Sequence, residues 1–344
     1  MRLVRLDEVL LTSSKPALVQ FDRCTLEEGD VLVMCAGFED RAIEALSKLE
    51  GNNKGFDAVL IEYRPEMTGN KSQAISAALH SQGARLISTI YDRENPAGFG
   101  SKFLDLARVA TGKLVIDISA MSRLLVVQLL VAIKQEPKLL QKTIILYTEA
   151  GSYPPSKGEV EQILMKRRDD PTYAIHFLSS GVFEITVVPE LSSISLAGEQ
   201  TRLVAFPSFN VDQLTALRAE LQPSRFVLVH GLPPREENEW RCDAIKRINS
   251  TEGLRAEEIS VSTLDYRQTL DALLEMYNLH GERDRIVVCP TGSKMQAVAV
   301  GLFRAFLDDV QIVYPTPKTF QTENYTTGIG ASHCLDLSFF AFVK

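Results

Sequence analysis

Twice along this chain, short strand-like runs rich in β-branched residues alternate with segments whose apolar residues have helical spacing. This alternation restricts the possible folds more than any other feature of the sequence. The first series contains the predicted strands Val31–Cys35, Phe56–Glu62 and Lys113–Ile118, and the second contains Phe226–His230, Glu258–Thr263 and Ile286–Cys289. Strands that alternate with helices predict a parallel sheet with right-handed crossovers. We therefore expect an α/β protein built from two tandem Rossmann-like units with parallel sheets.

The chain between the two series breaks this rhythm and marks the expected domain boundaries. A short helix over Glu159–Arg168 and a hairpin around Ser179–Gly181 are predicted there. We expect residues 1–150 to form the first Rossmann-like unit and residues 151–200 to form a connecting α+β insert of helix and hairpin. Residues 201–344 then form the second unit. A strand-like run over Arg2–Leu11 precedes the first series.

The two series match each other element by element. Val59–Ile61 corresponds to Val227–Val229 at an offset of 168 residues, and Leu114–Asp117 corresponds to Ile286–Cys289 at an offset of 172 residues. Similar offsets in a constant order predict an internal duplication. The layering that any two Rossmann-like units share accounts for part of the match.

The stretch Arg285–Phe306 predicts a buried strand, a short turn and a helix. Lys294 falls in the first turn of that helix, where a cation interacts unfavourably with the helix macrodipole at a cost of about 0.3–1 kcal/mol. A bound anion would make the position of Lys294 favourable. Backbone N–H groups, the hydroxyls of Thr291 and Ser293 and the Lys294 ammonium would then converge on the anion. A lysine that simply extends into water is the plain alternative.

The equivalent turn of the first series carries the same kinds of side chain, hydroxyls followed by a cation. Ligands of open α/β sheets bind outside the carboxyl ends of the strands, where both turns are expected. We therefore predict that a phosphate group is held by residues of the two turns: Ser119, Ser122, Arg123, Thr291, Gly292, Ser293 and Lys294.

The loops after the first strand of each series should lie beside these turns. They contain Phe38 and Arg41 in the first series and Phe209 and Asn210 in the second. The two phenylalanines suit stacking on nucleotide bases. Packing of the loops onto the sheet is the alternative for both rings.

Asp117, at the end of the fourth strand, is the best candidate for an acid or base, followed by Glu39 and Asp40. Carboxylates early in a helix are also ordinary capping residues, which is the simpler interpretation. A Walker A loop, a complete dinucleotide fingerprint and a nucleophile elbow are all missing from the sequence. The motifs therefore leave the protein's status as an enzyme open.

Composition narrows the expected partners. The formal net charge of −7 argues against an extended nucleic-acid-binding surface, which needs a wide basic face. The five cysteines are scattered without a CxxC pair and the histidines are isolated, so we expect no metal and no cofactor. A signal-peptide layout and an apolar run long enough for a membrane span are missing, so we expect a cytoplasmic protein without membrane contact.

The segment Val287–Met295, VVCPTGSKM, resembles the strand–turn–helix of the Rossmann-type sensor domains of prokaryotic immunity known as CARF, and of their fused double version, SAVED. Those families typically have two successive glycines where this chain has one, and the first copy, DISAMSR, keeps only hydroxyls and a cation. The resemblance implies binding of a cyclic or linear oligonucleotide, or another nucleotide signal, in a cleft between two Rossmann units. It also implies a separate effector or complex protein partner, because no attached effector is recognisable.

Two functions from different classes follow. The first is a nucleotide or cyclic-oligonucleotide sensor of a prokaryotic antiviral defence system, with the ligand between the two halves and the signal passed to a separate effector. The alternative is a hydrolase that acts on a nucleotide, nucleoside or NAD-type substrate, with Asp117 as base or nucleophile.

Overall fold

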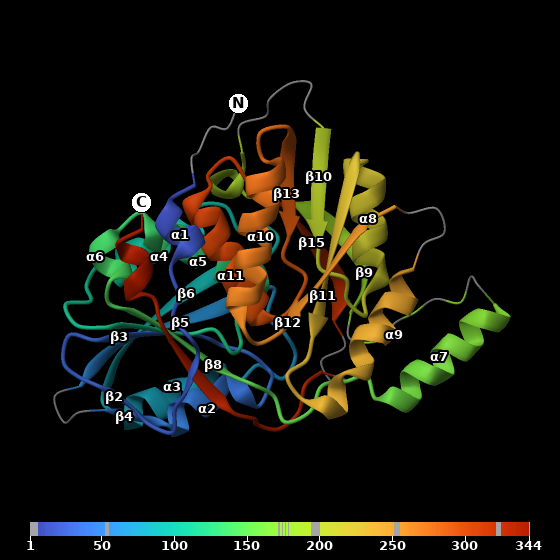
Figure 1. Ribbon diagram of the computed structural model, residues 1–344. Coiled ribbons are helices and arrows are strands. Elements are labelled where there is room, and N and C mark those ends of the chain that lie inside the picture. The colour runs from blue at the N-terminus through green and yellow to red at the C-terminus, as the bar shows by residue number, and fades with distance from the viewer. Residues whose placement is uncertain are drawn as a thin grey trace. The chain divides into compact units, whose positions relative to one another are not determined.

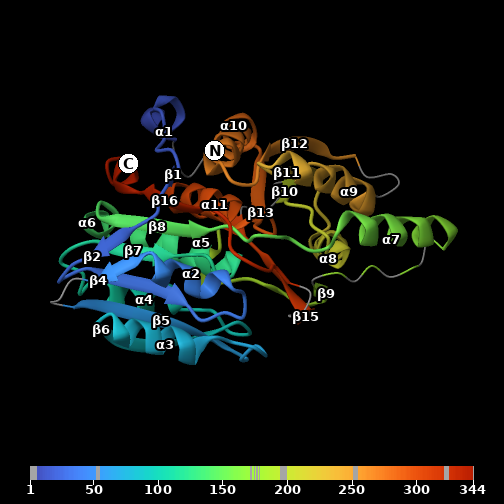
Figure 2. The same cartoon turned by 90° about the horizontal axis from the view of Figure 1, so that it is seen from below.

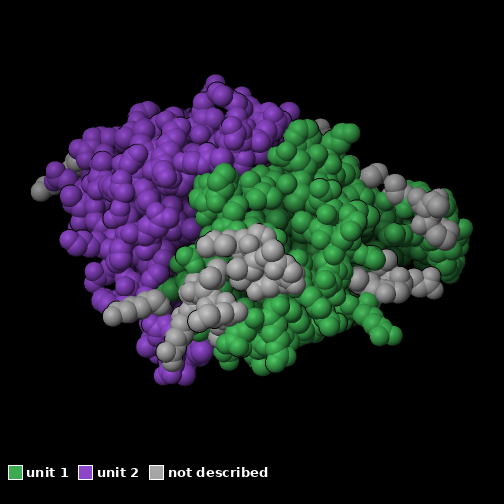
Figure 3. Space-filling view, turned by 90° about the horizontal axis from the view of Figure 1, so that it is seen from above, with its two compact units in different colours: residues 1–6, 154–325 green, residues 7–153, 326–344 purple. Residues whose placement is uncertain are grey.

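The computed structural model describes residues 6–343 except 52–54, 171–172, 174, 176, 178, 194–199, 251–254 and 321–324. It is an α/β protein, as the alternation of strands and helices predicts, and its described chain divides into two compact units (Figure 3). One unit comprises residues 7–153 and 326–344 and is called here the seven-stranded unit. The other, with Leu6 and residues 154–325, is the five-stranded unit.

The seven-stranded unit is built on a sheet whose central strands are parallel (Figure 1). Central strand β3 is buried along its whole length, as expected for a parallel strand covered on both faces. In sheet order the strands are β1 (Val19–Gln20), β16 (Ser332–Asp336), β8 (Thr143–Thr148), β7 (Leu114–Asp117), β3 (Val31–Cys35), β5 (Phe56–Arg64) and β6 (Ala84–Asp92).

Helices cover both faces of this sheet. Helices α2 (Arg41–Ser47) and α3 (Ser72–Ser81) pack into one apolar cluster with β3 and β5. Helices α4 (Phe99–Ala107) and α5 (Arg123–Lys134) contact each other, and α5 is buried from Leu124 to Ile133. The short elements are α1 (Glu8–Thr12), β2 (Cys24–Leu26), β4 (Leu49–Gly51), α6 (Pro137–Leu140) and the 3₁₀ turn Ser338–Ala341.

Two details differ from the sequence analysis. Glu8–Thr12 is a helix rather than part of a strand, because the Asp7 carboxylate accepts the Val9 N–H at 2.8 Å and caps it; residues 2–5 of that prediction lie outside the described chain. The whole of residues 201–344 is expected in the second Rossmann-like unit, yet strand β16, within that range, pairs antiparallel with β8 (Figure 2). Its Leu335 is buried there. Strand β16 therefore belongs to the seven-stranded sheet, where it lies between β1 and β8.

The five-stranded unit contains an entirely parallel sheet. In sheet order its strands are β12 (Glu257–Ser262), β11 (Arg225–Leu232), β10 (Gln200–Ala205), β13 (Asp284–Cys289) and β14 (Gln311–Ile312). Figure 1 shows α8 (Val211–Leu221) and α9 (Trp240–Asn249) on one face and α10 (Tyr266–His280) and α11 (Lys294–Phe306) on the other. The remaining elements are α7 (Lys157–Asp169), β9 (Ser179–Thr186), β15 (Tyr314–Phe320) and the 3₁₀ turns Pro189–Leu191 and Glu236–Asn238.

The parallel strands of both sheets follow the same order. Numbered along the chain within each unit, both run 3-2-1-4-5, so each sheet reverses direction between its first and fourth strands. In such sheets the crevice at the reversal is the usual ligand site. The exits of β3 and β7, and of β10 and β13, are therefore the places to examine.

The turn predicted at Ser179–Gly181 is part of a strand instead. These three residues begin strand β9, which pairs antiparallel with β15, a strand more than a hundred residues later. In the segment before this turn, residues 176 and 178 lie outside the described chain. A glycine between two apolar runs resembles a tight turn, and Gly181 does have a positive φ of 62°. The long-range partner β15 nevertheless provides the hydrogen bonds, which local sequence does not reveal.

Candidate functional site

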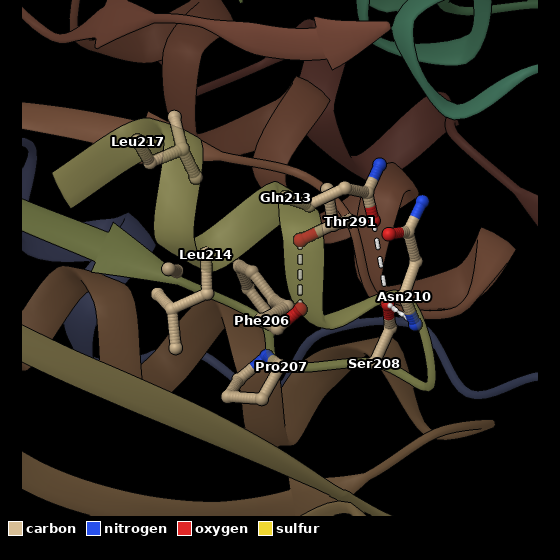
Figure 4. Close-up of a pocket in the computed structure, with 9 residues that line it drawn as sticks. Phe206, Pro207, Ser208, Asn210, Gln213, Leu214, Leu217 and Thr291 are labelled. Atoms are coloured by element: carbon tan, nitrogen blue, oxygen red, sulfur yellow. Dashed lines mark hydrogen bonds between the residues drawn. The ribbon is translucent and has the colours of Figure 1, made fainter. Parts of the chain in front are cut away.

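The exits of β10 and β13 form the reversal point of the five-stranded sheet. The Thr291 hydroxyl, buried after β13, donates to the carbonyl of Phe206 after β10 at 2.7 Å (Figure 4). Beside this bond lies a small hollow with room for about one water molecule, lined by both apolar and polar side chains. Its lining comprises Ala205, Phe206, Pro207, Ser208, Asn210, Gln213, Leu214, Leu217 and Thr291.

A capping box begins helix α11. Ser293 Oγ accepts the Gln296 N–H at 3.1 Å, while Gln296 Oε1 accepts the Ser293 N–H at 2.8 Å. The Ser293 hydroxyl also donates to the carbonyl of Thr263, after β12, at 2.5 Å. The Ser293 hydroxyl thus acts as both a donor and an acceptor, and these bonds hold the start of α11 against the end of β12. Its role in the structure is to position the turn.

Gly292 is required by the crowding of this turn. A Cβ at position 292 would lie 2.3 Å from Gln296 Oε1 and 2.9 Å from Phe206 Cδ1. A side chain there would force the capping box and the Phe206 ring apart. The single glycine of this turn therefore allows the exits of β10 and β13 to approach closely.

Lys294 is half-buried at the first position of α11. The first turn of this 13-residue helix contains no acidic side chain, so the positive end of the macrodipole and the Lys294 ammonium add together. Anion binding at this turn stays a prediction from the sequence.

The loop after β10 contributes Asn210 and Phe209. Asn210 caps α8 by accepting the Asp212 N–H at 3.2 Å, and its amide donates to Ser179 Oγ at 2.9 Å. Phe209 is only 5% exposed and lies edge-on to Phe177, with ring centroids 5.4 Å apart. The Arg241 guanidinium lies over the Phe209 ring at 4.8 Å. This is the packing role that the sequence analysis gave as the alternative to base stacking.

The corresponding edge of the seven-stranded sheet is closed by hydroxyl groups. Asp117, only 2% exposed, accepts both the N–H of Ser119 at 2.9 Å and its hydroxyl at 2.5 Å. Ser119 Oγ in turn accepts the Thr148 N–H at 2.8 Å. This carboxylate therefore shapes the turn after β7 and links it to the end of β8.

A buried ion pair lies on the other side of Thr148. Arg41 Nη2 is 2.6 Å from Glu39 Oε2, and Arg41 Nη1 donates to the Thr148 carbonyl at 3.5 Å. Burial opposes the charge on Arg41, yet the Glu39 carboxylate, with Tyr147 and Tyr153, raises the pKa of its guanidinium above the ordinary value. The Thr326 hydroxyl also donates to Glu39. Arg41 is thus held as a permanent buried cation at this edge.

The remaining predicted residues surround the start of α5. Ser122 caps the helix by accepting the Leu125 N–H at 3.3 Å, and its own N–H donates to Tyr63 Oη at 2.5 Å. Arg123, at the first helical position, and Phe38, in the loop after β3, are both half-buried. The two loops touch, because a Cβ at Gly37 would lie 2.9 Å from Ala120 Cβ.

Within each unit, the structure brings the predicted residues to one carboxyl edge. Sequence reasoning missed Gln296, although Ser293 and Gln296 have the Ser-x-x-Gln spacing of a capping box. It also missed Tyr63, which lies on a strand and contacts Ser122 only through the tertiary fold.

No family model matches this chain, and no curated protein matches it. Among solved structures, a type III CRISPR defence DNA nuclease activated by cyclic oligoadenylate is similar at a TM-score of 0.47 and 11% identity, over 87% of this chain and 68% of that chain. A mutant of O-ureido-L-serine synthase with bound O-ureido-L-serine gives a TM-score of 0.18 and 12% identity, over 87% of this chain and 74% of that chain. Similarities at this level do not define a function.

None of the helices in the described part of the chain is long and apolar enough to cross a membrane.

Proposed function

We propose that this chain is a nucleotide-binding sensor whose ligand binds at the carboxyl edge of the five-stranded sheet. The observation that carries this proposal is the turn Thr291–Lys294, where the buried Thr291 bond and Gly292 hold a positively charged helix start beside a hollow. A phosphate suits the helix start, because oriented N–H groups and an ammonium group both favour negative charge.

The hollow limits what else the ligand presents. It has room for about one water molecule, so it does not enclose a nucleotide base. Its mixed lining, which includes Phe206, Leu214, Ser208 and Gln213, offers apolar and hydrogen-bonding surface at its mouth. In this proposal the base rests against that mouth while the phosphate lies at the start of α11.

The seven-stranded unit supplies a second edge of the same design. Both sheets have the order 3-2-1-4-5, and in both a basic residue, Arg123 or Lys294, opens the helix after the fourth strand behind a serine N-cap. These shared features support an internal duplication, with Ser119, Ser122 and Arg123 as the second ligand-binding set. Contact of one ligand with both Arg123 and Lys294 stays a prediction from the sequence.

The biological setting proposed here is prokaryotic antiviral defence, in which ligand binding changes a conformational equilibrium that a separate effector senses. This part of the proposal rests on the resemblance of Val287–Met295 to CARF and SAVED domains. The hydrolase alternative gains no support from Asp117, because its carboxylate is buried and closes the turn after β7.

Ligand-induced stabilisation tests the proposal. The purified chain is screened by thermal unfolding against mononucleotides, linear dinucleotides and cyclic oligoadenylates. A ligand at about a hundredfold excess over its Kd adds about 2.7 kcal/mol to the stability of the folded state. Recovery of the ligand unchanged, analysed by chromatography after incubation, supports a sensor, and turnover supports the hydrolase.

Lys294→Ala then locates the site, and Lys157→Ala is its matched control. Lys157 also opens a helix, α7, behind a serine N-cap with a capping box, but it is exposed and follows a loop rather than a sheet strand. We expect Lys294→Ala to weaken the binding of the best ligand at least about tenfold, which corresponds to about 1.4 kcal/mol. Lys157→Ala should leave the affinity unchanged. Failure of every ligand to stabilise the wild-type chain would refute the proposed function.

A further inference from the structure

Strand β6 forms one edge of the seven-stranded sheet, and its outer side has no strand partner in the described chain (Figure 2). Its nine residues, Ala84–Asp92, pair with β5 alone in a regular parallel register. Among the described residues, none outside this pairing forms a backbone–backbone hydrogen bond with Leu86–Ile90. A strand at a sheet edge presents N–H and C=O groups outward, so β6 offers a row of donors and acceptors to a further strand.

The side chains of β6 leave apolar surface uncovered on both faces of this edge. Tyr91 faces α5, where its hydroxyl donates to Gln128 Oε1 at 2.7 Å, while Leu86 packs into the cluster of α2 and α3. Successive side chains of a strand point to opposite faces. Ile87 therefore lies on the α5 face and Ile90 on the face of α2 and α3, and these two side chains are 43% and 41% exposed.

The other edges of the two large sheets are protected in ways that β6 is not. Strands β1 and β14 are two residues long, and β12 begins with the exposed pair Glu257 and Glu258. Short edge strands and charged side chains prevent pairing with another chain. The interior of β6, Leu86–Tyr91, contains neither a charged residue nor a proline. A long uncharged edge of this kind is suited to pairing with a further strand.

We propose that two copies of this chain associate through β6, whose edges pair antiparallel about a two-fold axis and join the two seven-stranded sheets. An axis perpendicular to the sheet keeps each side chain on its own face, so opposed residues differ by an even number of positions. The register centred on Ser88, the midpoint of β6, meets this condition and pairs all nine residues. This dimer is independent of the proposed nucleotide site.

In the register centred on Ser88, compatible side chains lie opposite each other. Leu86 lies opposite Ile90 of the second copy on the face of α2 and α3, and Ile87 lies opposite Thr89 on the other face. Apolar and β-branched side chains in such cross-strand positions stabilise an antiparallel pair. The exposed isoleucines of both copies are covered together, so the edge is complementary to itself.

The charges at the two ends of β6 favour the same arrangement. Antiparallel pairing brings the Arg85 end of one strand to the Asp92 end of the other. A register centred on Thr89 would instead place Arg85 directly opposite Arg93 of the second copy, and like charges in that position are unfavourable. The charge pattern therefore points to a second copy of the chain in the register centred on Ser88.

Substitutions at the two-fold axis test this dimer, because Ser88 lies opposite Ser88 of the second copy. Ser88 is exposed, so Ser88→Lys and Ser88→Glu replace no packed side chain. In either variant alone, two like charges face each other across the axis, whereas a mixture of the two variants pairs opposite charges. Ser260→Lys is the matched control, since Ser260 is an exposed serine of the edge strand β12.

Sedimentation velocity measures the molar mass over a range of chain concentrations. We expect the wild type and Ser260→Lys to approach twice the 38.2 kDa of one chain, and each Ser88 variant alone to associate at least about tenfold more weakly. An equimolar mixture of Ser88→Lys and Ser88→Glu should regain the wild-type mass. Hydrogen exchange of the peptide containing Ala84–Asp92 should become slower as the wild-type dimer forms.

Three results would overturn this dimer. The first is a wild-type chain that keeps the mass of one copy at every concentration. The second is a dimer that both Ser88 variants still form, because the two copies would then meet at another surface. The third is a mixture of the two variants that does not associate. If one variant is less stable in thermal unfolding, the mixture still decides, since opposite charges at the axis restore the dimer only in this register.

Discussion

The Thr291 hydroxyl donates to the Phe206 carbonyl at 2.7 Å and so joins the exits of the two strands between which the five-stranded sheet reverses its order. Because both residues are buried, this bond holds the turn after β13 at a defined distance from the loop after β10. The hollow and the start of α11 both depend on that distance.

Replacing Thr291 by Val should therefore reduce the stability of the five-stranded unit. Valine fills the same volume but leaves the Phe206 carbonyl without its donor, at a cost of about 1–3 kcal/mol. Urea unfolding of the chain measures this cost. Thr291→Ser keeps the hydroxyl and is the control, which should lose markedly less stability. Equal losses in both variants would show that the methyl group, rather than the hydrogen bond, matters.

The buried pair Glu39–Arg41 should be strongly coupled. Arg41→Met leaves the Glu39 carboxylate buried without this guanidinium, and Glu39→Gln removes the charge that balances Arg41. Breaking one side of a buried ion pair costs about 3–5 kcal/mol. The double variant should lose much less stability than the two single variants lose together, as measured by a double-mutant cycle with urea unfolding. Additive losses would contradict the pairing.

His230 should make the chain less stable in mild acid. Burial, with a further contribution from Lys246, lowers the pKa of His230 below its ordinary value, although Glu258 raises it in part. In the unfolded chain a histidine takes up its proton near pH 6.5, whereas the folded His230 stays neutral to lower pH. The unfolded state then binds more protons, so stability falls as the pH drops below about 6.5.

His230→Gln removes this titration. Between about pH 7 and about pH 5, the variant should lose less stability than wild type, by at most about 1.4 kcal/mol per pH unit. Urea midpoints at the two pH values provide the comparison. Parallel losses in the two proteins would mean that His230 is protonated equally in the folded and unfolded states.

Strand β16 should be essential to the seven-stranded sheet although it comes from the end of the chain. Leu335 is 1% exposed and lies opposite Ile145 of β8, so Leu335→Ala should cost about 2–5 kcal/mol. Hydrogen exchange of the peptide containing Thr143–Thr148 should become faster as β8 opens. Leu232→Ala, at a leucine that is 43% exposed, is the matched control and should leave this exchange unchanged.

The fold class was predictable because its signal is local. Val31–Cys35 and the first three residues of the strand Leu114–Asp117 are continuous apolar runs, which is the pattern typical of buried parallel strands. The pairing of Ser179–Thr186 with Tyr314–Phe320 was not predictable, because strand partners are selected by packing between distant segments. The location of β16 was missed for the same reason.

The sequence predicted where the candidate site residues lie better than it predicted what each side chain contacts. The cations Arg123 and Lys294 stand at helix starts, where the pattern of strand, turn and helix placed them. Phe209 was a candidate for base stacking, yet its ring packs against Phe177 and Arg241. Whether an aromatic ring faces a ligand or the core depends on neighbours that are remote in the sequence.

The sequence by itself determined the periodicities, and with them the strands, the helices and the charged turns at the sheet edges, because hydrophobic spacing and capping chemistry act over a few residues. The tertiary structure alone decided which strand exits meet, as at Thr291 and Phe206, and which polar groups those contacts use. It left Gln296 Nε2 without a partner in the described chain, beside Gly231, since a hydrogen bond is made or missed only when distant segments have packed.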